Sequence, residues 1–83
     1  MTNADIASVF DHVADLIEYQ GGNVFRVRAY RTAARTIGAM VESLASVRAD
    51  AARTLTDLEG IGGDLAAKIE TLLDTGKLPL LEE

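Results

Sequence analysis

Residues 55–69 read LTDLEGIGGDLAAKI, and this stretch decides the fold. An apolar helix end at Leu58 is followed by Gly-Ile-Gly-Gly at residues 60–63 (the glycine turn) and then by a second apolar helix. Glycines permit a tight turn whose backbone N–H groups point outward at the start of the next helix. Such a turn binds a phosphate without a basic side chain, through its amides and the helix dipole. A pair of helices that binds no ligand is the alternative, and spacing alone leaves both open.

Apolar residues elsewhere recur at three- and four-residue spacing, which predicts amphipathic helices. The expected fold is therefore all-α, with four helices in antiparallel pairs. The first helix begins after Thr2 or Asn3 and ends at Gly21-Gly22, and the others run over residues 24–41, 47–58 and 62–74. The threonines at positions 54 and 56 disfavour a continuous third helix, so two short pieces are the alternative there.

The length of 83 residues predicts one small domain over residues 1–83, since a chain of this size supports one modest core. Pro79 suits the first position of a short C-terminal helix. The sequence ends at Glu83, within the first turn of that helix. We therefore expect a fragment or N-terminal domain of a longer protein.

The composition excludes several kinds of site. There is no Cys, which excludes disulfides, iron–sulfur clusters, Cys-ligated zinc and thiol nucleophiles. The single histidine, His12, cannot form a His-based metal site alone, and its position at the edge of an apolar stripe predicts a surface histidine. No apolar run approaches the ~18–20 residues of a membrane span. We expect a cytoplasmic protein, associated with the nucleoid if bacterial, with no cofactor and no membrane partner.

Charge is unevenly distributed along the chain. The net charge of −5 argues against a nucleic-acid partner. Residues 1–20, however, carry four acids and no Lys or Arg, whereas residues 21–40 carry four Arg and no acid. A local cluster acts within a Debye length of about 8–10 Å, so the arginine-rich segment can attract phosphate despite the net charge. Charge alone therefore decides nothing about the partner.

Two motifs together resemble a known family. The glycine turn is similar to a helix-hairpin-helix motif, the sequence-independent DNA-binding unit of many repair proteins. The run NVFRVRAYRTAA at residues 23–34, combined with this turn and with DTGKL at residues 74–78, resembles the N-terminal domain of the X family of DNA polymerases. The resemblance spans residues 3–81 and implies four helices, with the helix-hairpin-helix at about 55–74, that bind gapped or nicked DNA and its 5′-phosphate. Some members also remove 5′-deoxyribose phosphate by β-elimination through a Lys Schiff base.

Lys68 matches the Schiff-base lysine of that family, six residues after Gly62. A nucleophilic lysine must be neutral near pH 7, which requires burial or a neighbouring positive charge. The alternative is a lysine that covers apolar surface and reaches water. Three residues depart from the lyase pattern, because Asp64 and Thr56 replace lysines and Ala67 replaces a glutamate. An ion pair between Asp64 and Lys68 would also keep the amine protonated.

The remaining candidates lie mainly on the second helix. The resemblance places Arg26 and Tyr30 at the 5′-phosphate, Arg26 as a bidentate clamp and Tyr30 as a hydrogen-bond donor. A core aromatic is the alternative for Tyr30. The candidate DNA-binding residues are Gly60, Ile61, Gly62, Gly63, Arg26, Tyr30, Arg28, Arg31 and Arg35. The last three share another face, either a stripe along a phosphate backbone or a solvated face paired with the acids of the first helix. The metal expectation is limited to a monovalent cation at the carbonyls of Leu58 and Gly60.

Three hypotheses follow. The first is a DNA-binding module for gapped or nicked DNA in base excision or gap repair, adjoining a polymerase or another catalytic domain. The second is a 5′-deoxyribose-phosphate lyase that acts through Lys68. The third is a helical adaptor that has lost DNA binding, favoured by the net charge of −5. We expect no polymerase activity from this chain alone, because nucleotidyl transfer needs a carboxylate-bound metal pair.

Overall fold

A computed structural model describes residues 1–78 of the protein. Its elements are α1 (Asn3–Tyr19), α2 (Val24–Ala39), α3 (Leu44–Ala49), the 3₁₀ helix η1 (Leu55–Asp57) and α4 (Gly63–Thr75). No strand occurs within residues 1–78, and the all-α prediction is confirmed. The C-terminal helix expected at Pro79 lies outside the described residues.

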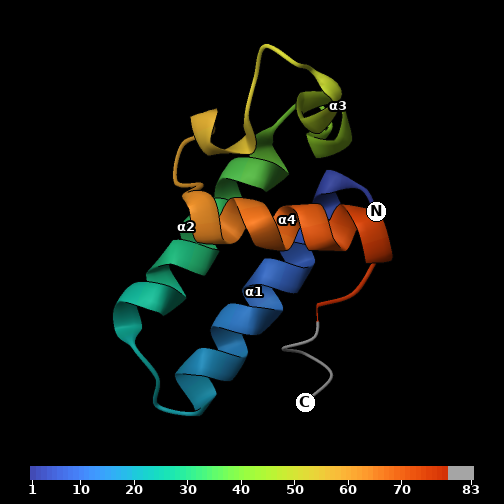
Figure 1. The fold of residues 1–83 in the computed structure, drawn as a ribbon. Coiled ribbons are helices and arrows are strands. Elements are labelled where there is room, and N and C mark those ends of the chain that lie inside the picture. Colours follow the sequence, from blue (N-terminus) through green and yellow to red (C-terminus); the bar gives the residue numbers. More distant parts are fainter. Residues whose placement is uncertain (79–83) are drawn as a thin grey trace.

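The helices α1 and α2 form an antiparallel pair, the first of two layers (Figure 1). Thr2 and Asp5 start α1 as a capping box, each side chain accepting a hydrogen bond from the other residue's backbone N–H. Gly21, at φ +69°, lets the chain reverse after α1. Asn23 then caps α2 by accepting a hydrogen bond from the N–H of Phe25 at 2.7 Å. These local signals explain why the first two helices begin where the sequence predicts.

The predicted single helix over residues 47–58 is wrong, and the two-piece alternative is correct. α3 begins earlier, because the hydroxyl of Ser43 caps it by accepting from the N–H of Ser46 at 3.1 Å. It ends before Asp50, whose backbone is extended and whose carboxylate accepts from an N–H two residues on, as in an Asx turn. Thr54 is also extended, so only the single turn of η1 follows.

The other helix ends differ from the prediction by one or two residues. α2 stops at Ala39 rather than at residue 41, because Met40 adopts an extended backbone with ψ 137°. α4 covers Gly63–Thr75 and ends at Gly76, whose φ of +73° gives the left-handed terminator that the sequence predicts. The segment that carries the glycine turn is therefore placed as expected.

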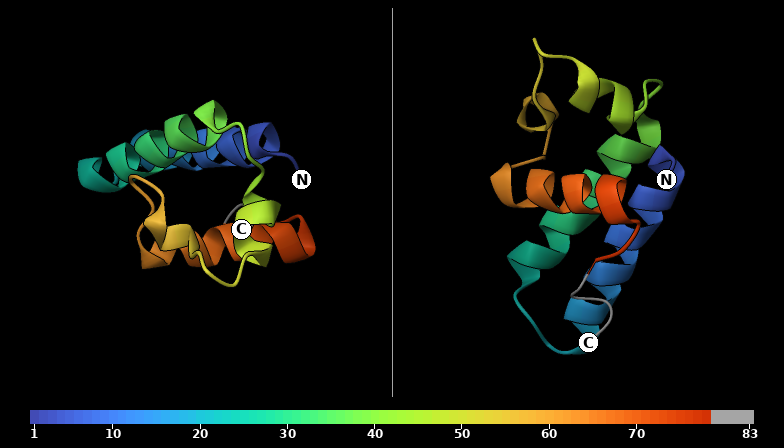
Figure 2. Two further views of the ribbon diagram at one scale, coloured as in Figure 1. Left: turned by 90° about the horizontal axis from the view of Figure 1, so that it is seen from above. Right: turned by 45° about the vertical axis from the view of Figure 1, so that its right-hand side comes forward.

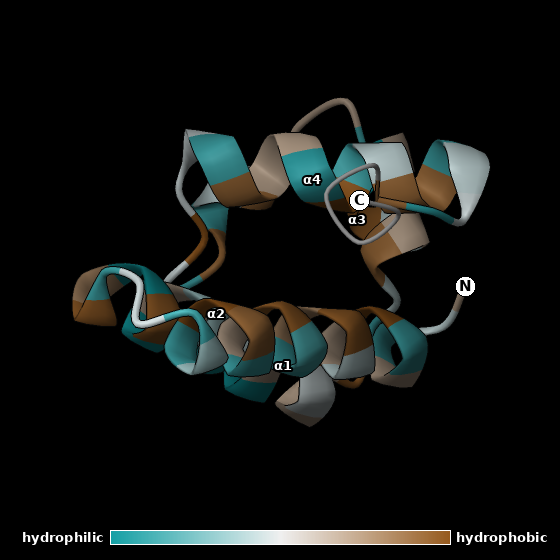
Figure 3. Ribbon diagram, turned by 90° about the horizontal axis from the view of Figure 1, so that it is seen from below, coloured by the Kyte–Doolittle hydropathy of each residue, from teal (hydrophilic) through white to brown (hydrophobic). Residues whose placement is uncertain are grey.

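The core lies between two layers. α3, η1 and α4 form the second layer, and α4 crosses over α1 and α2 (Figures 1 and 2). The apolar sides of the helices face one another across this interface (Figure 3). Phe10 of α1, Ile37 of α2, Val47 of α3 and Ile69 of α4 are all fully buried there. Ile61 from the glycine turn joins the same core, which fixes the turn relative to both layers.

Candidate nucleic-acid interface

The glycine turn is held by its own backbone and by α2. Gly60 has φ +77°, a conformation that favours glycine. It also packs so closely on α2 that an added Cβ would lie 2.9 Å from Cγ2 of Thr32. Ile61 is 3% exposed and donates its N–H to the carbonyl of Leu58 at 3.1 Å. The glycine turn therefore packs on α2 in one position, at Thr32, and this contact sets the direction in which α4 begins.

No side chain in the described part of the chain caps the start of α4. Its N-cap is Gly62, and the first helical hydrogen bond runs from the N–H of Ala66 to the Gly62 carbonyl at 2.9 Å. The N–H groups of residues 63–65 therefore have no carbonyl to bond inside the helix. An added Cβ at Gly62 or Gly63 would meet nothing within 4 Å, so the approach to this turn is open. These N–H groups lie at the positive end of the helix dipole and suit a phosphate.

Asp64 and Lys68 form an ion pair one turn into α4, with Nζ 2.8 Å from Oδ1. Burial lowers the pKa of the Lys68 ammonium more than any other single influence. The hydrogen bond to Asp64, together with the attraction of Tyr30 and of the Asp64 charge, outweighs burial, so the pKa lies above its ordinary value. Lys68 is therefore protonated at neutral pH. The raised pKa of Lys68 contributes stability that is fully present below the ordinary lysine pKa and is lost as the pH rises through the raised one.

The sequence leaves open whether Tyr30 is a core aromatic or a hydrogen-bond donor to a phosphate, and its position in the structure is compatible with both. Its side chain is 2% exposed, and its ring makes an edge contact with Phe10, with centroids 5.4 Å apart. Its hydroxyl oxygen is buried and has no hydrogen-bond partner among residues 1–78. It lies close enough to Lys68 to raise that lysine's pKa, although no hydrogen bond of ordinary length joins them. A phosphate reaches this hydroxyl only after a neighbouring side chain moves.

Arg31 is engaged by the acidic side of α1. Its Nη2 lies 2.8 Å from Oδ1 of Asp15 and 3.8 Å from Oε1 of Glu18, and its Nη1 lies 3.7 Å from Oδ1 of Asp11. The hydrogen bond to Asp15 raises the pKa of the guanidinium further above its ordinary value. Arg31 therefore offsets part of the negative charge of α1 and is poorly placed to meet a phosphate.

The other three arginines of α2 are exposed and make no ion pair within the described part of the chain. Arg28 and Arg35 are seven residues apart, so they share one face of the helix, next to the face that carries Thr32. Arg26 lies four residues before Tyr30, on the side that turns toward α4. The predicted arginine stripe thus divides, with Arg31 paired to α1 and the other two arginines unpaired beside the glycine turn.

A comparison with family models agrees with this geometry. The model of the helix-hairpin-helix domain matches residues 1–78. The chain belongs to the helix-hairpin-helix domain family. No curated protein matches the chain. Domains of this family typically bind DNA, so DNA is the general class of partner that the family indicates.

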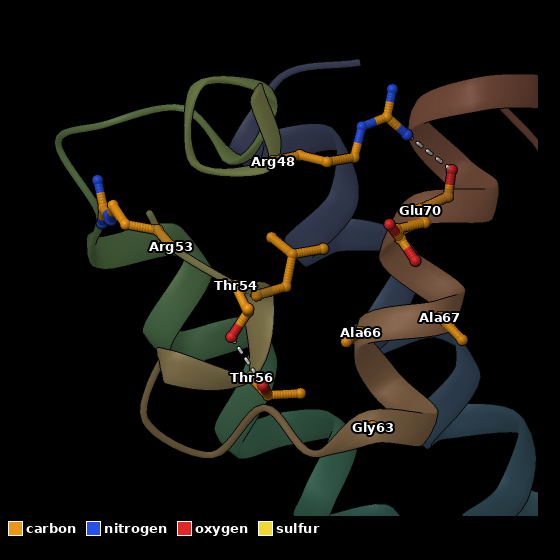
Figure 4. A pocket seen from close by; sticks show the side chains of 9 residues that line it. Arg48, Arg53, Thr54, Thr56, Gly63, Ala66, Ala67 and Glu70 are labelled. Carbon is orange, nitrogen blue, oxygen red and sulfur yellow. Dashed lines mark hydrogen bonds between the residues drawn. The ribbon is translucent and has the colours of Figure 1, made fainter. Parts of the chain in front are cut away.

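This helix-hairpin-helix domain also has a cavity of about 340 Å³ between α4 and the segment around η1 (Figure 4). Its lining residues are Arg48, Arg53, Thr54, Leu55, Thr56, Gly63, Ala66, Ala67 and Glu70. Both arginines are engaged, Arg48 with Asp74 at 2.7 Å and Arg53 with Glu42 at 2.6 Å. The two threonine hydroxyls bond to each other at 2.9 Å. Lys68 does not line this cavity, so it is separate from the candidate lyase site.

The remaining sequence predictions concern metals and membranes. Within residues 1–78, no group of three or more His, Cys, Asp or Glu side chains could hold a metal ion. No helix in the same range is long and apolar enough to cross a bilayer. His12 is exposed on α1, in agreement with the prediction. The carbonyl of Leu58 accepts one hydrogen bond and keeps a second lone pair. The monovalent cation at the carbonyls of Leu58 and Gly60 stays a prediction.

Proposed function

We propose that this helix-hairpin-helix domain binds gapped or nicked DNA at its 5′-phosphate, as the N-terminal domains of X-family polymerases do, in base excision or gap repair. The proposal rests on the uncapped start of α4, where the N–H groups of residues 63–65 follow an open glycine turn. Such groups hold a phosphate regardless of the base, because every nucleotide carries one. A polymerase or another catalytic domain would adjoin this module in the full-length protein.

The arginines of α2 supply the positive charge for this binding. Arg28 and Arg35 lie on the helix face next to Thr32, which supports the glycine turn. A phosphate backbone that crosses the turn would therefore meet both guanidiniums. Arg26, on the Tyr30 side of α2, is the candidate clamp for the terminal 5′-phosphate, since a guanidinium binds phosphate in a bidentate manner. Contacts of this kind allow a chain of net charge −5 to hold DNA locally.

The arginines give the first test. Replacing Arg28 or Arg35 with Ala should each reduce the slope of log affinity against log salt by about one, because one phosphate contact is lost. Arg31→Ala is the matched control from the same helix. Its guanidinium bonds to Asp15 rather than to DNA, so the slope should stay that of the wild type. Fluorescence anisotropy with a labelled gapped duplex at several salt concentrations measures these slopes.

The choice of DNA tests the substrate class. A gapped duplex with a 5′-phosphate should bind more tightly than the same duplex with a 5′-hydroxyl, and both should bind more tightly than an intact duplex. Equal affinity for all three would contradict recognition of the gap and leave general DNA binding. Lack of salt-dependent binding to any of them would contradict the proposal and favour the helical adaptor.

Lyase activity is the second candidate function, because Lys68 matches the Schiff-base lysine of the X family and burial favours its neutral amine. In the wild type the pairing with Asp64 opposes this, so the pKa of Lys68 is raised overall. Asp64→Asn removes the carboxylate that holds the ammonium, so the pKa of Lys68 should fall and the neutral amine should become more abundant. We expect borohydride to trap more covalent adduct with 5′-deoxyribose-phosphate DNA in this variant than in the wild type. The comparison is made at saturating DNA, because the lost negative charge also raises the affinity.

Lys68→Ala in the Asp64→Asn background is the control for this reaction. It should trap no adduct if Lys68 is the nucleophile. An equal adduct in this double variant would assign the reaction to another amine. No adduct in any variant, with DNA binding intact, would exclude the lyase and leave the binding module.

A further inference from the structure

The turn between α1 and α2 carries an exposed apolar patch. It consists of Tyr19 at the end of α1 and of Val24 and Phe25 at the start of α2, which are 91%, 57% and 72% exposed. Exposed apolar groups that gather in one place mark contacts with another molecule, unlike single ones scattered over a surface. The DNA contacts proposed above use none of these three side chains.

The cavity between α4 and the segment around η1 is a second feature that the proposed function does not use (Figure 4). Its volume of about 340 Å³ is roughly twice the ~150 Å³ of a cavity that holds benzene, so a phenyl ring fits inside. Leu55 and Ala66 supply buried apolar surface to its lining, and Ala67 adds a small side chain. The guanidiniums of Arg48 and Arg53 point outward at opposite sides of the cavity, so their aliphatic stems line it.

The patch and the cavity lie at opposite ends of the molecule. The turn between α1 and α2 is at the end away from α3 and η1, and the molecule extends 39 Å along its long axis (Figures 1 and 2). Phe25 therefore cannot reach the cavity of its own chain, whereas it can reach the cavity of a second copy. An apolar group on one surface and a pocket elsewhere on the same molecule make a head-to-tail contact.

The charges beside the two surfaces are complementary. Arg26 and Arg28 follow the patch, are exposed and make no ion pair among residues 1–78. Both arginines of the cavity are matched by carboxylates. Glu70 also lines the cavity and makes no ion pair with any described residue, so it leaves one negative charge there in excess. Opposite charges on two surfaces favour and orient their encounter.

We propose that Phe25 of one copy inserts into the cavity of a second copy, with Arg26 and Arg28 directed toward Glu70. Each copy in such an assembly still offers a cavity or a patch to a further copy, so the assembly lengthens as the concentration rises. The contact is small, which makes the association weak and reversible. It requires no DNA and is therefore independent of the proposed function.

The test measures self-association of the full chain without DNA, by sedimentation at increasing protein concentration. The wild type should form a series of oligomers that becomes shorter as salt screens the charges. Phe25→Ala should weaken the association about thirtyfold or more, as expected for an aromatic anchor at the centre of an interface. Val41→Ala is the matched control, because Val41 is exposed but belongs to neither surface, and it should associate like the wild type.

A mixing experiment distinguishes this head-to-tail contact from a contact between like surfaces. Ala67→Arg places a long side chain over the cavity from an exposed position on α4, in a residue type that favours helix, and this variant alone should not associate. A mixture of Phe25→Ala with Ala67→Arg should form a 1:1 dimer, because the first variant keeps the cavity and the second keeps the ring.

Two results would overturn the inference. One is a mixture that stays monomeric, and the other is a wild type that stays monomeric up to about 1 mM. Both leave the proposed function standing, because anisotropy measures DNA binding separately and at low protein concentration. A wild type that neither associates nor binds DNA would overturn both.

Discussion

Replacing Gly60 with Ala is expected to lower the free energy of unfolding by about 2–5 kcal/mol and to abolish DNA binding. The left-handed backbone at φ +77° costs an L-residue about 1–2 kcal/mol. The new methyl group would also lie 2.9 Å from Cγ2 of Thr32, and overpacking of this kind costs about 1–3 kcal/mol. Relief of the clash displaces the glycine turn, and the N–H groups at the start of α4 move with it. Urea denaturation followed by circular dichroism measures the stability, and anisotropy measures the binding.

Two variants separate the cost of the left-handed backbone from the cost of the close contact between the new methyl group and Thr32. Gly76 has φ +73° and open space around it, so Gly76→Ala should cost only the backbone part, about 1–2 kcal/mol. Thr32→Ser deletes the methyl group that the new side chain would meet, so the double variant with Gly60→Ala should recover the crowding part and some DNA binding. If Gly60→Ala lowers the free energy of unfolding no more than Gly76→Ala does, the close contact of the glycine turn with Thr32 contributes less to the cost than the geometry indicates.

Tyr30→Phe should raise the stability of the free protein while it weakens recognition of the 5′-phosphate. The Tyr30 hydroxyl is buried without a partner among residues 1–78, and an unsatisfied group of this kind costs about 1–3 kcal/mol. Each kcal/mol regained should raise the Tm by about 4–8 °C in a domain of this size. The same hydroxyl is the candidate donor to the 5′-phosphate, and a hydrogen bond to a charged group contributes about 1.5–3 kcal/mol, or roughly a tenfold to hundredfold preference.

The control is the chain's other tyrosine. Tyr19 is 91% exposed and its hydroxyl is solvated, so Tyr19→Phe should change neither the Tm nor the 5′-phosphate preference. Thermal melts give the first quantity, and anisotropy with 5′-phosphate and 5′-hydroxyl gapped DNA gives the second. If Tyr30→Phe raises the Tm but keeps the full preference, Tyr30 only packs in the core and Arg26 must hold the phosphate without it.

The helices that the sequence predicts well are those whose limits are set by local chemistry. α1, α2 and α4 start or end at capping residues and glycines that act within a few positions of themselves, so their spacing is readable directly. α3 differs, because its cap Ser43 lies in a polar segment with no apolar periodicity to mark the start of a helix. Its end is set by Asp50, whose side chain accepts a hydrogen bond from the backbone two residues on. The apolar pattern of residues 47–58 continues across that stop and therefore predicts a single helix there.

The candidate site also has features that follow from local sequence and features that depend on how the helices pack. The Asp64–Lys68 pair follows from i, i+4 spacing on one helix, and the structure contains this pair, which raises the pKa of the Lys68 ammonium. The division of the arginine stripe depends on how α1 packs against α2, which places Asp15 beside Arg31, whereas Arg28 makes no ion pair with any acid of residues 1–78. No local pattern carries that information.

The separation of charge between α1 and α2 governs how the domain approaches DNA. At low ionic strength, where screening extends to about 30 Å, a phosphate backbone repels the molecule as a whole through its net charge of −5. Near physiological salt the screening length falls to about 8 Å, so the phosphate backbone of DNA interacts only with the nearest side chains. A domain that approaches with α2 toward the DNA is then attracted, whereas one that approaches with α1 is repelled. Moderate salt therefore speeds and orients the encounter even as it loosens the final complex.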